Sequence, residues 1–448
     1  MKWIVTFWSR VWLPLTTVLL VCSVVMSEQA SSRARKDTKK HVEFWVSWTG
    51  FEFDAIHDVV KDFNASQKEI QVDLLTVGNL ATKTLLSVSA GIPPDLVVFS
   101  GPQIPQIVDA RSLEELTPLT QKHGIRKEDY IESYWQFGEY QGGLYSLPIC
   151  PATMGLLYNR DILEAAGYKR DQVPETFEEL FEYSVKLTKM NGSKVVTAGF
   201  LPAEPGWWNY NYGPLFGGSL WDGGDNVTPD HEGNVRAMTW IQEFSKKFGA
   251  SNIQQFKSGL GNFASPENGF LAGKVGMEIQ GVWMNNFVEQ YSPKLNWGVV
   301  DIPYPKDMPE LKGRSMVDSD VIVIPKGSKV VDATGVFLEY LLSQPVIEKF
   351  CAAHQKTTAL KKKSPEFWAN HKNPYIRFFD DLGLRKNYIA PPKIGVWAEY
   401  QAELVNAYEV VALQQKSPKD ALLDVKNRIQ PMFEKYRERL KAREAAGK

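Results

Sequence analysis

Cysteine is scarce in this chain, and the spacing of its thiols excludes two classes of site. Only 3 cysteines occur among 448 residues, and no C-x-x-C pair is present. Zinc sites and dithiol redox motifs need closely spaced thiols, so we expect neither. Cys22 lies near the N-terminus, which leaves Cys150 and Cys351 for the folded protein. An exported chain could join these two by a disulfide, but two distant cysteines make no disulfide framework.

Net charge is also nearly absent. Lysine plus arginine number 51 and aspartate plus glutamate 52, which gives a formal net charge of −1. The chain therefore has no bulk attraction for nucleic acid or an acidic membrane surface, and we expect no nucleic-acid partner. The stretch DGGDN at 222–226 lacks the alternating ligands and terminal glutamate of an EF-hand, so it indicates a turn. We expect no metal and no cofactor.

The N-terminus has the pattern of a targeting segment. Lys2 and Arg10 precede residues 11–25, which are almost wholly apolar. A positive start followed by such a run predicts a secretory signal peptide over residues 1–27. The run is near the lower length limit for crossing a bilayer, so a membrane anchor is the alternative interpretation.

The residues around the end of the apolar run leave one question open. Residues 28–40 are polar and basic, which predicts a flexible leader. Cys22 follows Leu19-Leu20-Val21, a weak match to a bacterial lipoprotein box, so lipidation at Cys22 stays open. With or without a lipid, we expect an exported protein.

From His41 onward the hydrophobic pattern alternates between strand and helix. The first five elements are expected at residues 42–46, 53–63, 70–77, 80–90 and 96–99. Strands separated by helix-length segments predict βαβ units and hence an α/β fold. A later helix should begin at TFEE, residues 176–179, because this sequence is a capping box. At 448 residues the chain is too long for one ordinary core, so two or three domains are expected.

The stretch 142–161 contains two closely spaced prolines between apolar runs. Apolar runs lie on either side of Pro148 and Pro151. Each proline fixes its own φ and restricts the residue before it, so a regular helix cannot pass here. The segment predicts either a buried strand pair or an extended crossover between two lobes, with a ligand held beside it.

Short motifs along the mature chain match a known family in their order and spacing. They are AGIPPDLV at 90–97, GLYSLP at 143–148, LYNRD at 157–161, PETFEEL at 174–180, FGG at 216–218, GKVGM at 273–277 and GVW at 281–283. Together they resemble the extracellular solute-binding proteins of ABC sugar importers, a group that includes maltose-, multiple-sugar- and glycerol-phosphate-binding proteins. The resemblance covers almost all of the mature chain.

The resemblance implies a two-lobed periplasmic-binding-protein fold of type II, with discontinuous α/β lobes joined by hinge crossings. The stretch 142–161 is then the first crossing, and the region of Pro303 and Pro305 is the second. Paired prolines suit a hinge because they leave rotation about few bonds. The lobes are expected at residues 41–149 plus 303–346 and at residues 150–302 plus 347–448.

The function that the resemblance implies is capture without chemistry. The protein is expected to be the substrate-binding component of an ABC transporter and not an enzyme. It would take a sugar or oligosaccharide into the cleft between the lobes and deliver it to permease subunits in the membrane. We expect a monomer, located in the periplasm or on the outer face of the cytoplasmic membrane.

Two segments depart from the family pattern. The sequence HQKTTAL at 354–360 replaces a Gly-Tyr-hydrophobic-Pro turn, and Asp318-Ser319-Asp320 stands where small residues are common. These differences can change which sugar binds or the shape of the rim of the cleft. Cys150 and Thr153 occupy positions that are expected to face the cleft.

A sugar presents C–H faces to aromatic rings and hydroxyls to fixed donors and acceptors, so its cleft needs both kinds of group. Aromatics make up 12% of the chain, with 14 tryptophans, and several gather in an irregular stretch at 202–230. Of Trp207 and Trp208, one should face the cleft and the other should pack. The candidate ligand-binding residues are Trp48, Glu52, Asn79, Ser100, Thr153, Trp207, Trp208, Trp283, Asp318, Ser319 and Arg385.

Position in the predicted elements supports several of these candidates, each with an ordinary alternative. Trp283 follows a strand and a glycine, so it should lie at a carboxyl end, where open α/β sheets bind ligands; a core position is the alternative. Glu52 and Ser100 also follow strands, but they suit a helix start and a turn. Asn79 suits a turn, and Arg385 suits a solvated surface.

Two other functions compete with sugar capture. An exported glycoside hydrolase needs two carboxylates about 5–10 Å apart across a cleft, and Glu52 and Asp318 are candidates. A structural or adhesive envelope protein is the third interpretation. Incubation with oligosaccharides separates the first two, because a binding protein leaves the sugar intact and a hydrolase releases reducing ends.

Overall fold

The computed structural model describes residues 38–202 and 208–445. The predicted signal peptide, Cys22 and all of the leader before residue 38 lie outside the described residues, as does Trp207. Within the described residues, no helix is both long enough and apolar enough to span a bilayer.

One eight-stranded sheet runs through the molecule, in the order β10-β6-β11-β3-β1-β2, with β9 paired to β6 and β12 paired to β11. The predicted α/β alternation at the start of the chain is confirmed, and β1 lies parallel to both β2 and β3. The strands of this sheet are β1 (Lys40–Val46), β2 (Ile70–Thr76), β3 (Leu96–Ser100), β6 (Leu147–Asn159), β9 (Met277–Gly281), β10 (Trp297–Val300), β11 (Ser315–Val323) and β12 (Tyr388–Ile389). Two small hairpins pair β4 (Glu139–Tyr140) with β5 (Gly143–Leu144) and β7 (Lys189–Asn191) with β8 (Lys194–Thr197).

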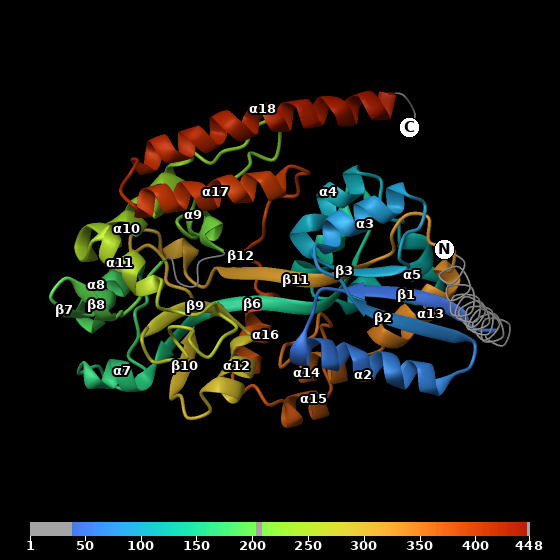
Figure 1. Cartoon of the computed structure of the whole chain (residues 1–448), viewed down its shortest axis with the longest axis horizontal. Helices are drawn as coiled ribbons and strands as arrows, with labels where there is room; N and C mark the ends of the chain where they lie inside the picture. Colours follow the sequence, from blue (N-terminus) through green and yellow to red (C-terminus); the bar gives the residue numbers. More distant parts are fainter. Residues whose placement is uncertain (1–37, 203–207, 446–448) are drawn as a thin grey trace, which may run out of the picture.

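Helices cover this sheet in two groups (Figure 1). Around β1, β2 and β3 lie α2 (Gly50–Ser66), α3 (Leu80–Ser89), α4 (Ile104–Asp109), α5 (Thr117–Lys122) and α13 (Val331–Leu342). Around the other end lie α7 (Arg160–Ala165), α8 (Phe177–Leu187), α9 (Tyr212–Leu215), α10 (Glu232–Phe248), α11 (Ala250–Lys257) and α12 (Met284–Tyr291). The remaining helices are α6 (Glu132–Trp135), α14 (Gln344–Ala353), α15 (Pro365–Asn370), α16 (Ile376–Leu384), α17 (Trp397–Ala412) and α18 (Pro418–Ala445).

The strands β6 and β11 join the two groups. The first part of β6 pairs with β11, and its last residues pair with β9 and β10. The end of β11 in turn pairs with β3. The stretch around Pro148 and Pro151 is therefore a buried strand paired with β11, as one interpretation of the sequence predicted. It also passes from one group of elements to the other, and its role as a hinge between lobes stays a prediction.

A β-bulge accommodates the prolines of this crossing. Cys150 pairs with Asp320 and Pro148 pairs with Val321, so Ile149 has no opposite residue in the ladder. Bulges interrupt the ladder and so tolerate a residue that has no N–H to donate. The carbonyl of Ile149 instead accepts a hydrogen bond from the thiol of Cys351, 3.3 Å away.

Two segments bear on the expected lobe boundaries. Tyr304 forms a bridge with Thr176, at the start of α8, so the chain is still in the second group of helices there and returns by β11. The expected boundary after Val346 falls inside α14, which packs on α2. We therefore propose that the first lobe includes the final residues of β11 and all of α14. The other lobe boundaries stay predictions.

The predicted capping box at the start of α8 is confirmed. The Thr176 hydroxyl accepts from the N–H of Glu179 at 3.2 Å, and the Glu179 carboxylate accepts from the N–H of Thr176 at 3.4 Å. We expect Thr176→Ala to lower the free energy of unfolding by about 1 kcal/mol, because two N–H groups lose their acceptor or its orientation. Urea denaturation measures this, and Thr176→Ser, which keeps the hydroxyl, should restore most of the loss. Equal stability of the alanine and serine variants would contradict the assignment.

The long helix α18 extends from the second group of helices toward the first (Figure 1). Arg443, in its last turn, donates to the carbonyl oxygen of Asp109 at 2.9 Å. The Asp109 carboxylate accepts from the Tyr140 hydroxyl at 2.9 Å and from Gln141 at 3.0 Å. Burial raises the pKa of Asp109 to about 6, and the bonds from Tyr140 and Gln141 oppose this shift.

This carboxyl makes stability depend on pH. Its folded pKa lies above the ordinary value of 3.8, so between pH 3.8 and about 6 the folded state holds a proton that the unfolded chain releases. Stability from this group is thus lost as the pH rises through that window. We expect the free energy of unfolding of Asp109→Asn, relative to wild type, to rise by roughly 1–3 kcal/mol between pH 4 and pH 7. Urea titrations at both pH values test this, and a constant difference would contradict it.

Candidate ligand-binding cleft

A cavity of ≈ 800 Å³ lies where the two groups of elements meet. Volumes of this size suit ligands as large as drug molecules or short oligosaccharides. Four of its residues carry aromatic rings, three carry carboxyl groups and one carries an ammonium. The lining residues are Trp48, Glu52, Ser100, Ala152, Leu260, Gly261, Asn262, Phe263, Ala264, Trp283, Phe287, Asp318, Asp320 and Lys356.

The two sides of this cavity come from distant parts of the chain. On one side, Trp48 follows β1, Glu52 lies in the first turn of α2, and Ser100 ends β3. On the other, Trp283 precedes α12 and Phe287 lies within it. The crossing strands β6 and β11 form the floor between them. The cavity therefore lies at the carboxyl ends of β1 and β3, where open α/β sheets bind ligands.

The aromatic rings are fixed by their neighbours. Trp283 is 8% exposed, and its ring centroid lies 6.5 Å from that of Phe263, in an edge-on arrangement. A Cβ at Gly281 would lie only 2.1 Å from Cζ3 of Trp283, so the ring can take this position only over a glycine. On the opposite side, the Trp48 ring lies 5.2 Å from His354 and 5.7 Å from Phe350. Each tryptophan packs against an aromatic neighbour and also lines the cavity.

Charged groups lie close together at the floor. The Lys356 ammonium is 3.7 Å from Oε1 of Glu52 and 3.6 Å from Oδ2 of Asp320. The Asp318 carboxylate accepts from the Ser319 N–H at 2.7 Å and from the Ser100 hydroxyl at 3.3 Å.

Burial and mutual attraction act on these groups in opposite directions. Burial raises the pKa of Asp318 and that of Asp320, whereas the nearby Lys356 lowers both. Burial lowers the pKa of Lys356, but negative charge on the Cys150 sulfur, Asp320 and Glu52 raises it above the ordinary value. Lys356 therefore remains an ammonium across the physiological range.

Five of the predicted site residues line this cavity: Trp48, Glu52, Ser100, Trp283 and Asp318. Asn79 lines a neighbouring cavity of ≈ 420 Å³, which also includes Ser100 and Asp320. The structure thus brings six candidates to one region, although their predicted contact with ligand remains a prediction. The strand-end positions expected for Trp283 and Ser100 are confirmed.

The structure does not bring the other candidates to the cavity wall. Thr153 is fully buried and donates to the carbonyl of Phe379 at 2.8 Å, and Ser319 is 1% exposed. Both point away because successive side chains of a strand alternate between faces. Cys150, also expected to face the cleft, is fully buried, with its sulfur 3.7 Å from Nδ1 of His354.

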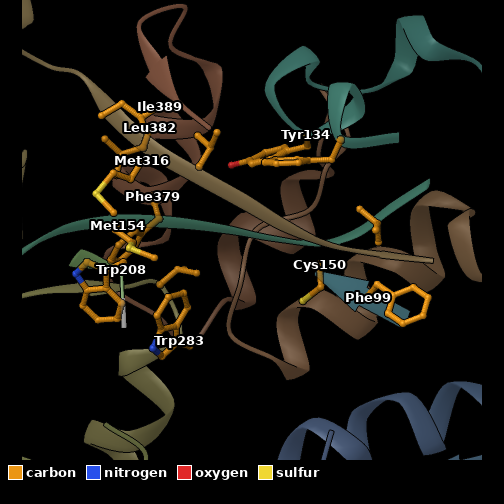
Figure 2. Packing of buried hydrophobic residues seen from close by; sticks show 14 of the residues in the cluster. Phe99, Tyr134, Cys150, Met154, Trp208, Trp283, Met316, Phe379, Leu382 and Ile389 are labelled. Atoms are coloured by element: carbon orange, nitrogen blue, oxygen red, sulfur yellow. The ribbon is translucent and has the colours of Figure 1, made fainter. Parts of the chain in front are cut away.

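Two further candidates make contacts within the fold and do not line the cavity. Arg385 forms ion pairs with Asp301 at 2.9 Å and with Asp381 at 2.8 Å and is not part of the cavity lining. Trp208 is 2% exposed and belongs to the buried hydrophobic cluster, part of which is drawn in Figure 2. Of the tryptophan pair, Trp208 is therefore the packed member, and Trp207 lies outside the described residues.

Several lining residues were not predicted. Asp320 had a usable signal, because it is two residues from Asp318 on one strand and so shares its face. Lys356 lies in the segment 354–360 that departs from the family pattern, but nothing in its neighbours indicates a cleft position. Phe287 follows Trp283 by four residues, about one helical turn, so this spacing was a usable signal. Phe263 meets Trp283 and Phe287 only through the tertiary fold.

The acidic stretch at 222–226 is a turn, as predicted. One carboxylate oxygen of Asp222 accepts from the N–H groups of Gly224 at 2.7 Å and Asn226 at 3.1 Å. The other accepts from the Asn226 side chain at 2.7 Å. Across the described ranges 38–202 and 208–445, no cluster of three or more His, Cys, Asp or Glu side chains has the arrangement of a metal site.

The sequence of this chain is similar to those of bacterial solute-binding proteins. The profile of a family described as bacterial extracellular solute-binding protein matches residues 52–347. A maltotriose-binding protein of Pyrococcus abyssi is 23% identical over 380 residues, which is 81% of this chain and 76% of that protein. The sn-glycerol-3-phosphate-binding periplasmic protein UgpB of Shigella flexneri is 25% identical over 352 residues, covering 70% of this chain and 73% of its own.

Solved structures show the same likeness. The structure described as CpMnBP1 with mannotriose bound superposes with a TM-score of 0.76 at 25% identity, covering 87% of this chain and 99% of that one. The sugar-binding protein MalE of Xanthomonas citri superposes with a TM-score of 0.73 at 21% identity, covering 90% of this chain and 99% of its own.

Proposed function

This chain belongs to the bacterial extracellular solute-binding protein family, and on that premise we propose that it is the sugar-capturing component of an ABC importer. Its two-lobed α/β fold is the type II fold of periplasmic sugar-binding proteins. The family consists of substrate-binding proteins, which bind and release their ligand without chemistry.

One observation carries this proposal: the cavity between the lobes combines aromatic rings from both sides with carboxylates at the floor. Trp48 and Trp283 come from opposite sides, and Glu52, Asp318 and Asp320 lie between them. Aromatic rings stack on the apolar faces of sugars, and carboxylates accept hydrogen bonds from hydroxyls. A carbohydrate uses both kinds of surface, whereas a purely apolar ligand would displace water from these half-buried carboxyl groups without replacing its hydrogen bonds.

Capture is expected to couple to closure of the lobes. The crossings β6 and β11 connect the two sides of the cavity, so a rotation there changes the distance between Trp48 and Trp283. A sugar that contacts both sides binds the closed form better and shifts the equilibrium toward it. We propose that the closed form is the one that permease subunits recognise.

A thermal-shift screen with neutral and acidic oligosaccharides, followed by calorimetry on the hits, tests the proposal. A ligand that binds only the folded state raises the melting temperature. The sugar recovered after overnight incubation should be intact by mass spectrometry. Release of reducing ends would instead support hydrolysis by the cavity carboxylates, and the absence of any carbohydrate ligand would reject the proposal.

We also propose that the mature protein acts as an exported monomer at the outer side of the cytoplasmic membrane. The N-terminal targeting pattern and the family support export. Fractionation of cells that express the full chain tests this, with Cys22→Ser as the matched variant. Release of wild type from the membrane without detergent would argue against lipidation, and recovery in the cytosol would argue against export.

A further inference from the structure

The segment that follows α14 delivers a charged side chain to the cleft. Residues 354–360 follow α14, and Lys356 is the member that lines the cavity. His354, Thr357 and Thr358 are fully buried, and Lys356 itself is only 4% exposed. An ammonium this deep in a protein is rare unless carboxylates surround it.

Side chains of α12 and of the loop between α15 and α16 hold this segment in place. The Asn286 side chain donates to the carbonyl of His354 at 2.7 Å, and Asn373 donates to that of Gln355 at 3.4 Å. Gln355 has a φ of 54°, a left-handed conformation that is uncommon outside glycine, and its side chain accepts from Asn285. The position of Lys356 is therefore set before any ligand arrives, which reduces the entropy lost on binding.

Among the lining residues that the structure describes, carboxyl groups outnumber ammonium groups around Lys356. Three carboxyl groups, those of Glu52, Asp318 and Asp320, share the cavity with this single ammonium. Its separations from Glu52 and Asp320, 3.7 and 3.6 Å, exceed hydrogen-bond length, so the ammonium offsets their charge at a distance. A hydroxyl between them can accept from Lys356 and donate to a carboxylate, whereas a carboxylate or a fully ionised phosphate has no proton to donate.

We infer that Lys356 and the three carboxyl groups make this cleft specific for uncharged saccharides and exclude anionic ones. The inference rests on the proposed function and narrows it. An anionic sugar brings a further negative group next to carboxyl groups that outnumber the ammonium, and like charges in a partly buried site repel strongly. The relatives of this chain include a maltotriose-binding protein, whose ligand is uncharged, and glycerol-phosphate-binding proteins, whose ligand is anionic. The carboxyl groups in the cleft favour an uncharged ligand.

Matched ligands test the inference directly. Calorimetry compares mannotriose with trimannuronate, maltotriose with its uronic-acid trimer, and galactotriose with trigalacturonate; sn-glycerol 3-phosphate is a further anionic probe. We expect binding by at least one neutral trimer and roughly 100-fold weaker binding by its acidic counterpart, the scale on which like-charge contacts discriminate. An acidic sugar that binds as tightly as its neutral partner overturns the inference but leaves the proposed function. If no saccharide binds, both are rejected.

Charge variants show whether these residues are responsible. In Glu52→Gln/Asp320→Asn the negative surplus is gone, so the preference for the neutral trimer should fall by at least about tenfold. Lys356→Gln should increase the preference, and Lys362→Gln, at an exposed lysine of the same region, should leave it unchanged. Melting temperatures report whether each variant is folded. A ratio of neutral to acidic affinity that is the same in all four proteins would overturn the assignment.

Discussion

Replacing Asp380 with alanine is expected to lower the free energy of unfolding by roughly 3–5 kcal/mol, because it leaves a buried ammonium without its partner. The Lys363 side chain is 1% exposed, and its Nζ lies 2.6 Å from Oδ1 of Asp380. The same oxygen accepts from the Thr357 hydroxyl at 2.5 Å. The change therefore removes one partner from each of two buried groups. Urea denaturation followed by circular dichroism measures the loss.

Two controls separate burial from distance in this result. Lys349 and Asp62 are also 2.6 Å apart, but their side chains are 61% and 50% exposed, so Asp62→Ala should change stability little. The double variant Asp380→Ala/Lys363→Met should recover much of the loss, because it removes the unpaired ammonium as well. If the buried and exposed pairs cost the same, burial is not what makes the Asp380 contact important.

The second large effect is expected at Trp283. Its replacement by alanine should weaken carbohydrate binding by roughly 1–3 kcal/mol, since a stacked aromatic anchor is lost from the cavity wall. The side chain is only 8% exposed and packs near Phe263, so the change also removes buried contacts and should lower the stability of the fold. Calorimetry at a temperature where the variant remains folded gives the affinity, and a melting curve gives the stability separately.

A second tryptophan provides the matched control. Trp240 is 9% exposed, donates to the carbonyl of Phe177 at 3.0 Å and does not line the cavity. Trp240→Ala should therefore reduce stability while the dissociation constant stays close to that of wild type. An unchanged dissociation constant in Trp283→Ala would show that its ring supports the fold without contacting the sugar.

Features that depend on near neighbours in the chain were predictable. The alternation of strand and helix over the first sixty residues after His41 was confirmed within a few residues at each end. The capping box depends on two side chains three residues apart, and it forms as expected. The prolines at 148 and 151 predicted an extended segment that no helix crosses, because they restrict φ locally, and β6 is such a segment.

The contents of the cleft were only partly predictable, because distant segments form it. Trp208 and Trp283 were both candidates for the cleft, yet Trp208 belongs to the core and Trp283 reaches the cavity. Arg385 was a candidate from its position in the chain, but Asp301 and Asp381 occupy its guanidinium. Whether an aromatic or charged side chain reaches the cleft depends on the residues from distant segments that pack around it.

The sequence by itself determined the family, the α/β class and the path of the crossing, since these follow from local periodicity, proline geometry and ordered motifs. Only the tertiary structure decided which side chains share the cleft and what charge it carries. Lys356 meets Glu52 and Asp320 there, although the three lie far apart in the chain. Electrostatic interactions depend on distance in space and on burial, and neither quantity can be read from the order of residues.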